Sequence, residues 1–200
     1  MQIEIYAATR PQQNRTANED AFLIGRGPTP YAVICDGVGN AQQSAKKACS
    51  LFEKLISEPT EIQDSAIWQR WIKILDSCLL GGHQSTFVGM AIVGTQLVGA
   101  SVGDSRLYLF DREGELCILT ENTKRLGSSH AEPFIIRHSP RSGDILLMMS
   151  DGAYGPLNLY ALKKAIVSAT SRHFSEMPEA ILNAAKSRED DATVVALRLR

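Results

Sequence analysis

The order of strand-like and helix-like segments limits the fold of this chain more than any other feature of its sequence. Short apolar runs of the kind found in strands occur in groups, the longest over residues 86–110, and helical patterns lie between these groups. A doubly wound parallel sheet would instead alternate strand and helix one for one. We therefore predict an α+β fold with antiparallel sheets flanked by helices. The length of 200 residues predicts a single domain, residues 1–200.

The individual segments follow from the spacing of apolar residues and from the turn residues between them. Residues 41–57 carry apolar side chains every three or four positions, and Asn40 is a suitable N-cap for that helix. A second stripe over residues 62–80 predicts another helix. Further helices are predicted over residues 158–171 and 178–187, and strands over residues 2–8, 31–35, 116–119, 134–138, 145–149 and 193–199.

The charge balance and the cysteine pattern restrict the partners and the compartment. The 21 Lys and Arg nearly cancel the 22 Asp and Glu, so we expect neither nucleic acid nor a membrane as a partner. No apolar run reaches the roughly 18 residues of a membrane-spanning helix, and the first residues lack the pattern of a signal peptide. The four scattered cysteines are typical of reduced core residues, which favours a cytoplasmic protein.

Acidic residues recur at positions where apolar strands are predicted to give way to turns. The four places are Asn18-Glu19-Asp20, Asp36-Gly37, Asp151-Gly152 and Asp190-Asp191. Carboxylates that project from neighbouring strand ends are suitable oxygen ligands for Mg²⁺ or Mn²⁺. Each Asp-Gly pair taken alone is more often an ordinary turn, and spacing does not show that the four places converge.

Five motifs, read in chain order, resemble the motif series of the type 2C metal-dependent protein phosphatases. They are Arg15-x-x-Asn18-Glu19-Asp20, Asp36-Gly37-Val38-Gly39, Gly103-Asp104-Ser105-Arg106, residues 146–152 (LLMMSDG) and residues 190–195 (DDATVV). Residues 85–91 also resemble a strand of that family, with Gln84 in place of its usual glycine. The resemblance implies a four-layer α-β-β-α sandwich of two antiparallel sheets, with a two-metal site at one end.

The resemblance also implies roles for individual residues in that site. Asp36 would bridge two divalent cations, Mn²⁺ or Mg²⁺, and Gly37 would bind one of them through its backbone carbonyl. The remaining ligands would be Asp151 and Asp190 for one ion, and Glu19 and Asp20 for the other, directly or through water. The implied reaction is the hydrolysis of phosphomonoesters on serine or threonine by in-line attack of a metal-bridging water or hydroxide.

Two further residues complete the implied site. Arg15 would hold the substrate phosphate, because a planar guanidinium can donate two hydrogen bonds to it, although an exposed loop cation is the ordinary alternative. Asp104 matches a position that in bacterial relatives supports a third, more weakly bound ion. No covalent protein nucleophile is needed in this scheme.

The chain departs from the family pattern at two places beside the site. Val38 stands where many eukaryotic members carry a histidine after the Asp-Gly pair. Asn122-Thr123 stand where the family has an Asp-His pair, and residues 124–133 leave room for only a reduced version of the mobile flap that follows. Because such loops commonly govern substrate contact, we expect a more open site and do not transfer the specificity of relatives.

Three functions are consistent with these residues. The leading one is a serine/threonine phosphoprotein phosphatase, with a phosphoprotein as substrate and a cognate serine/threonine kinase as a candidate partner. The second is a catalytically silent module that keeps the fold and binds phosphoproteins, which the changes at Val38 and Asn122 favour. The third is a hydrolase of small phosphate esters, which an open site would also admit.

Overall fold

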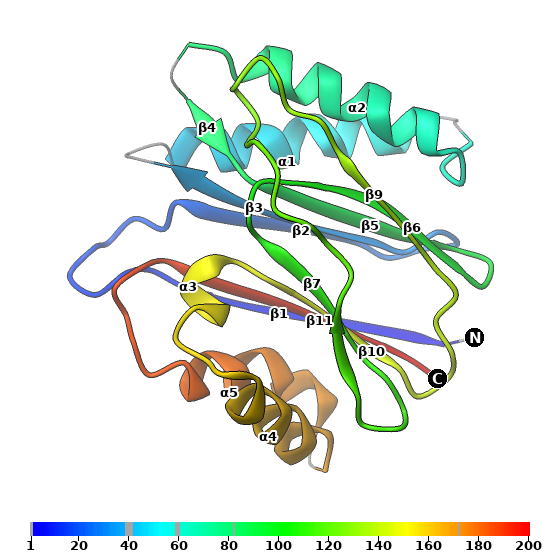
Figure 1. The fold of residues 1–200 in the computed structure, drawn as a ribbon, viewed down its shortest axis with the longest axis vertical. Coiled ribbons are helices and arrows are strands. Elements are labelled where there is room, and N and C mark those ends of the chain that lie inside the picture. The colour runs from blue at the N-terminus through cyan, green and yellow to red at the C-terminus, as the bar shows by residue number, and fades with distance from the viewer. Residues whose placement is uncertain (1, 39–41, 59–60, 82, 172) are drawn as a thin grey trace.

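Two antiparallel β-sheets form the centre of the fold (Figure 1). The computed structural model describes residues 2–38, 42–58, 61–81, 83–171 and 173–200. The first sheet has the order β1 (Ile3–Arg10), β11 (Ala192–Leu199), β10 (Ile145–Met149), β7 (Arg106–Phe110) and β8 (Leu116–Ile118). The second has the order β2 (Asp20–Gly25), β3 (Tyr31–Val38), β5 (Phe87–Val93), β6 (Gln96–Val102) and β9 (Phe134–His138), with β4 (Gln84–Ser85) also paired to β3.

Helices cover the outer face of each sheet (Figure 1). The second sheet is covered by α1 (Gln42–Ser57) and α2 (Ser65–Cys78). The first is covered by α4 (Leu159–Thr170), the short 3₁₀ helix η1 (Phe174–Glu176) and α5 (Met177–Ala184). A single helical turn, α3 (Asp151–Tyr154), directly follows β10. No helix in the described ranges is long and apolar enough to span a bilayer.

The strands alternate their side chains between two apolar layers, and this produces the predicted four-layer sandwich. In β10, Leu147 packs toward the helices of the first sheet, whereas its neighbours Leu146 and Met148 pack between the two sheets. Residues of β3 divide in the same way between the helix layer and the intersheet layer. Strands buried on both faces are continuous apolar runs, which is the pattern that residues 145–149 show.

The predicted helices are present, with different ends. The helix predicted over residues 62–80 begins at Ser65, because Asp64 accepts a hydrogen bond from the Ala66 backbone N–H and caps the first turn. Asn158 caps α4 in the same way, through the Ala161 N–H. The last predicted helix, residues 178–187, is shorter and runs from Met177 to Ala184. The proposed cap Asn40 and the predicted helix start at residue 41 lie outside the described residues.

The prediction that apolar strands deliver each acidic residue into a turn is correct for Asp151 and wrong for the others. Asp20 opens β2, and Asp36 lies within β3, which continues to Val38. Asp190 precedes β11. The physical reason is the antiparallel order of both sheets, in which one strand begins where its neighbour ends. Residues at strand starts and at strand ends therefore lie at the same end of the sandwich.

Candidate metal and phosphate site

The predicted acidic residues gather at one end of the two sheets. Asp20 and Asp36 are directly opposite each other in the β2–β3 pair. In the other sheet, β10 and β11 are antiparallel neighbours, so that Asp151 after β10 and Asp190 before β11 lie at the same end. Burial and the charge of Asp190 both raise the pKa of Asp151, which is consistent with this proximity.

Asp20 is held between the sheets by Ser150. The Ser150 hydroxyl donates to Asp20 Oδ2 at 2.8 Å and accepts the backbone N–H of Thr193 at 2.9 Å. Asp20 is buried, and its other oxygen, Oδ1, has no hydrogen-bond partner among the described residues. A buried carboxylate oxygen without a donor is costly unless something binds it, which makes this oxygen available to a cation. Sequence reasoning did not assign a role to Ser150.

Gly152 allows the turn that carries Asp151 to approach the turn that carries Asp190. A Cβ atom on Gly152 would lie 2.1 Å from the backbone carbonyl oxygen of Asp191. A side chain at this position would therefore force α3 away from the start of β11. A pocket of about 390 Å³ opens beside Asp151 and Asp190, with Pro156 and Glu189 among its other walls, and it connects both carboxylates to solvent.

The pKa values show that these carboxyls crowd one another. Burial raises the pKa of Asp36 to about 9, and the negative charges of Asp20 and Asp151 add to the effect. Burial likewise raises the pKa of Asp20 to about 7, although the nearby hydroxyls of Thr193 and Ser150 oppose it. Each raised pKa means that the ionised form lacks compensating positive charge. A divalent cation is the kind of ligand that would supply it.

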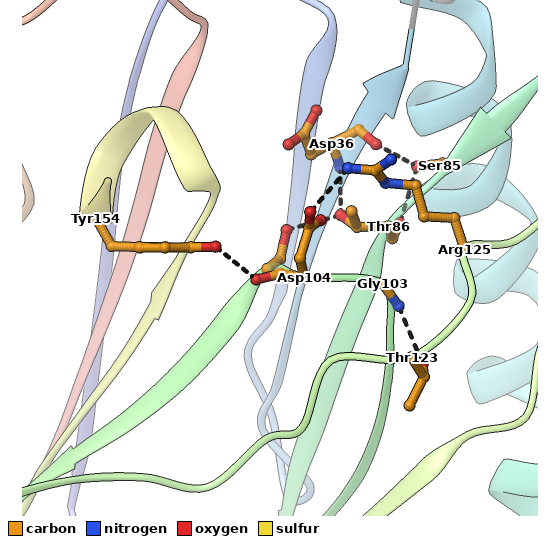
Figure 2. Close-up of polar contacts among 9 residues, drawn as sticks. Asp36, Ser85, Thr86, Gly103, Asp104, Thr123, Arg125 and Tyr154 are labelled. Atoms are coloured by element: carbon orange, nitrogen blue, oxygen red, sulfur yellow. Dashed lines mark hydrogen bonds and ion pairs between the residues drawn. The ribbon is translucent and has the colours of Figure 1, made fainter. Parts of the chain in front are cut away.

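The backbone around Asp36 is fixed by two hydroxyl residues from the segment before β5. The Asp36 N–H donates to Thr86 Oγ1 at 2.9 Å, and the Asp36 carbonyl accepts the Ser85 hydroxyl at 3.0 Å (Figure 2). Gly37 lies in β3, with its N–H donating to the Glu19 carbonyl at 3.2 Å. These contacts give a structural reason for the resemblance at residues 85–91, because this segment positions the strand that carries the central aspartate.

Arg15 lies in the loop between β1 and β2, and hydrogen bonds to Asp191 hold this loop in place. The two carboxylate oxygens of Asp191 accept the backbone N–H groups of Gln12 and Glu19, each at 2.6 Å. Arg15 Nη1 is 3.3 Å from Glu19 Oε2, and the arginine side chain is 46% exposed. Asp191 is buried and was not assigned a role from the sequence, although its place in the Asp190-Asp191 pair was a signal.

Asp104 lies in the turn between β6 and β7 and is already paired with an arginine. Arg125 donates to Asp104 Oδ2 at 2.8 Å, and Tyr154 donates its hydroxyl to the Asp104 backbone carbonyl at 3.0 Å. Figure 2 shows the two side chains reaching Asp104 from opposite sides. The preceding Gly103 has a φ of +87°, and a Cβ there would meet Thr86. Sequence reasoning missed Arg125, which lies in the segment where the family pattern breaks down.

Comparison with known families identifies this architecture. Residues 31–200 match the model of the family described as SpoIIE, Stage II sporulation protein E. The chain belongs to the SpoIIE family. No match was found among curated proteins.

Solved structures share the fold of this SpoIIE-family chain over nearly its whole length. The catalytic domain of the serine/threonine phosphatase PstP with two manganese ions has a TM-score of 0.81 at 21% identity, covering 98% of this chain and 97% of that one. Stp1 from Staphylococcus aureus gives 0.86 at 19%, covering 100% and 96%. RsbX in complex with magnesium gives 0.78 at 17%, covering 99% and 96%.

These findings confirm the α+β sandwich and the resemblance to metal-dependent phosphatases at the level of fold and family. The chain shares its fold with the serine/threonine phosphatase PstP and with RsbX, whose structures contain manganese and magnesium respectively. Identities of 17–21% show the fold and leave the activity and the ligand residues as predictions.

The donor atoms of the SpoIIE-family site fit hard divalent cations. The candidate side chains are carboxylates, and three of their own oxygens are buried without a partner among the described residues: Asp20 Oδ1, Asp104 Oδ1 and Asp151 Oδ1. Over the same residues, no three His, Cys, Asp or Glu side chains form a ready-made metal-binding group. Binding would therefore require the carboxylates to draw together, with water completing the coordination, as Mg²⁺ commonly requires.

Proposed function

We propose that the chain is a metal-dependent serine/threonine phosphoprotein phosphatase. The observation that carries the proposal is the group of mutually repelling carboxylates, Asp20 buried and Asp36 and Asp151 partly buried, that both sheets contribute at one end of the sandwich. Such a group is unfavourable for a folded protein unless it binds positive charge. Family membership supports the reaction class, and the substrate would be a protein that carries phosphoserine or phosphothreonine.

The proposed metal ligands divide between the two sheets. Asp36 is directly opposite Asp20 in the β2–β3 pair, and its pKa is raised by burial and by the negative charges of both Asp20 and Asp151. It is therefore suited to bridge two ions, with the Gly37 carbonyl beside it. The remaining ligands would be Asp20 and Glu19 on one side, and Asp151 and Asp190 on the other. When bound, the two ions would supply a nucleophilic water at neutral pH and offset charge on the phosphoryl oxygens.

Arg15 is suited to bind the substrate phosphate at the edge of this group. Its guanidinium is roughly half exposed and contacts one carboxylate, Glu19, so that several of its N–H donors are available. The loop that carries it is anchored by the hydrogen bonds of Asp191 to Gln12 and Glu19. An anchored arginine loses less entropy when it binds than one on a free loop.

A second candidate function is a binding module that recognises phosphoproteins without hydrolysing them. Two observations favour it: the described residues form no ready-made metal-binding group, and Arg125 is ion-paired with Asp104. A phosphorylated segment could still be held by Arg15. A cognate serine/threonine kinase as a functional partner is compatible with either candidate.

The deciding experiment is phosphate release from a phosphothreonine peptide with Mn²⁺, Mg²⁺ or EDTA. We expect metal-dependent turnover that Asp36→Asn and Asp151→Asn each reduce by more than about 100-fold, since even outer-shell changes at metal sites cost 10- to 100-fold. Glu61→Gln, an exposed residue outside the site, is the matched control. Binding of the phosphopeptide without turnover by the metal-saturated protein would favour the binding module, and preference for para-nitrophenyl phosphate would favour a small-ester hydrolase.

A further inference from the structure

We propose that Arg125 supplies, at Asp104, the positive charge that a third divalent cation would otherwise provide, so that no metal binds there while the arginine is present. This inference rests on the proposed function, because it assumes that the neighbouring carboxylates form a metal centre. It starts from the ion pair in which Arg125 Nη2 lies 2.8 Å from Asp104 Oδ2 (Figure 2).

Arg125 is held in position by contacts on both sides of it in the chain. Before it, the Thr123 N–H donates to the Gly103 carbonyl at 3.0 Å, and the Gly103 N–H donates to Thr123 Oγ1 at 3.2 Å. After it, Leu126 is fully buried and exchanges two backbone hydrogen bonds with Ser85, at 2.9 and 3.2 Å. The backbone on either side of residue 125 is therefore fixed, at Thr123 and at Leu126, and less entropy is lost when the Arg125 side chain forms the ion pair.

The same contacts connect Arg125 to the central aspartate. Ser85 donates its hydroxyl to the Asp36 carbonyl, and the adjacent Thr86 accepts the Asp36 N–H. Thr86 Oγ1 also lies 2.7 Å from Ser105 Oγ, and Ser105 is the next residue after Asp104. The segment that stands in place of the family's flap thus fixes an arginine at the edge of the acidic group.

The ion pair and a metal ion compete for the same carboxylate. Asp104 Oδ2 accepts a hydrogen bond from the Arg125 guanidinium, and the other oxygen, Oδ1, is buried without a partner in the described residues. A cation bound to Oδ1 would lie next to the positive charge of Arg125 and be repelled by it. If the guanidinium is removed, both oxygens become available beside Asp151, whose pKa is raised by burial, by Asp190 and by Asp104.

The test is the number of Mn²⁺ ions bound per chain, measured by titration with the paramagnetic resonance signal of free Mn²⁺. Five proteins are compared: wild type, Arg125→Ala, Arg125→Lys, Asp104→Asn, and the double variant Arg125→Ala/Asp104→Asn. We expect Arg125→Ala to bind one more ion than wild type, and the double variant to lose that ion. Arg125→Lys keeps a positive charge and should match wild type, as should Asp104→Asn alone.

Two outcomes would overturn the proposal. One is a folded Arg125→Ala variant that binds no additional ion, and the other is an Asp104→Asn variant that binds one ion fewer than wild type. The second outcome is measured on the Asp104→Asn variant, in which Arg125 is unchanged. It can therefore overturn the proposal even if the Arg125→Ala variant does not fold. Wild type that binds no Mn²⁺ at all would contradict the proposed function, whereas the difference between wild type and Arg125→Ala would still decide the role of Arg125.

Discussion

The acidic residues at this end of the sandwich occupy two contrasting environments. We call Asp20, Asp36 and Asp151 the carboxylate cluster, and here each side chain faces other acids in a largely buried setting. Asp104, at the edge of this cluster, instead faces a guanidinium held in place by the chain. The same residue type is thus left uncompensated in one place and neutralised in the other.

The contrast indicates which part of the site depends on a ligand. In the carboxylate cluster, burial and repulsion raise the pKa values of Asp20 and Asp151, whereas Asp104, which likewise keeps one buried unpaired oxygen, has a guanidinium beside it. Such a cluster is destabilising by itself and becomes favourable when cations bind. The ion pair of Asp104 and Arg125 needs no ligand, and with both side chains about one-third exposed it contributes little to stability.

The largest expected effect is stabilisation of the carboxylate cluster by metal. At a concentration of Mn²⁺ about 100 times its dissociation constant, binding adds ~2.7 kcal/mol to the free energy of unfolding and raises the melting temperature by roughly 5–10 °C. Asp36→Asn should lose most of this shift and Asp104→Asn should keep it, as measured by thermal melting with and without EDTA. Equal loss in both variants would remove the contrast between the two environments.

The second effect is the pH dependence of the metal-free protein. The pKa of Asp36 is raised to about 9 in the folded state and is about 4 in the unfolded chain. The folded state therefore holds a proton that the unfolded state has lost, so the stabilising contribution is complete below about pH 4 and is lost as pH rises through the folded pKa. Asp20, with a pKa of about 7, acts in the same direction.

The Asp36→Asn variant tests whether the ionisation of Asp36 destabilises the metal-free protein. With EDTA present at pH 8, we expect the variant to melt on the order of 4–8 °C above wild type, equivalent to ~2 kcal/mol, because its side chain needs no proton to be neutral. At pH 4 the difference should nearly vanish. Melting curves across this pH range are the measurement, and a variant that is less stable than wild type at pH 8 would show that burial and the neighbouring acids do not destabilise the ionised form of Asp36.

The residues of the cluster could be predicted from the sequence, whereas the way in which they are brought together could not. The motifs around Asp20, Asp36 and Asp151 identified them without a structure. The incorrect prediction that each acid ends a strand arose because the direction of neighbouring strands is not visible in local patterns. Only the antiparallel pairing of Asp20, the first residue of β2, with Asp36, near the end of β3, shows that residues from the start of one strand and the last part of another can share one site.

The supporting residues were missed because their roles depend on partners that are distant in the chain. Ser150 contacts Asp20, 130 residues away, and Asp191 accepts the N–H of Glu19, 172 residues away. Arg125 reaches Asp104 because the chain is anchored on either side of it, at Thr123 to Gly103 and at Leu126 to Ser85. None of these contacts follows from the spacing of apolar residues, and each depends on the packing of the two sheets.

The third prediction concerns Ser150, which donates a hydrogen bond within the carboxylate cluster. Ser150→Ala removes the donor to Asp20 Oδ2 and the acceptor of the Thr193 N–H, both of which are buried. Leaving these groups unpaired should lower the free energy of unfolding by ~1.5 kcal/mol, or roughly 3–6 °C in melting temperature. Urea denaturation is the measurement, with the exposed Ser57→Ala as the control. Equal effects of the two changes would contradict the bridging role of Ser150.

The smallest effect is expected at Asp104, where the charge is already compensated. Asp104→Asn should change the stability of the metal-free protein by less than ~1 kcal/mol, or less than about 2–4 °C, because the ion pair with Arg125 is partly exposed. The sign should also be opposite to that of Asp36→Asn, since here the substitution removes an attraction instead of a repulsion. The measurement is the melting temperature of both variants at pH 8 in EDTA, with and without 0.5 M NaCl. Salt should reduce the effect of Asp104→Asn further, because it screens the ion pair. If Asp104→Asn stabilised the protein as strongly as Asp36→Asn, Asp104 would belong to the carboxylate cluster, and Arg125 would not be compensating its charge.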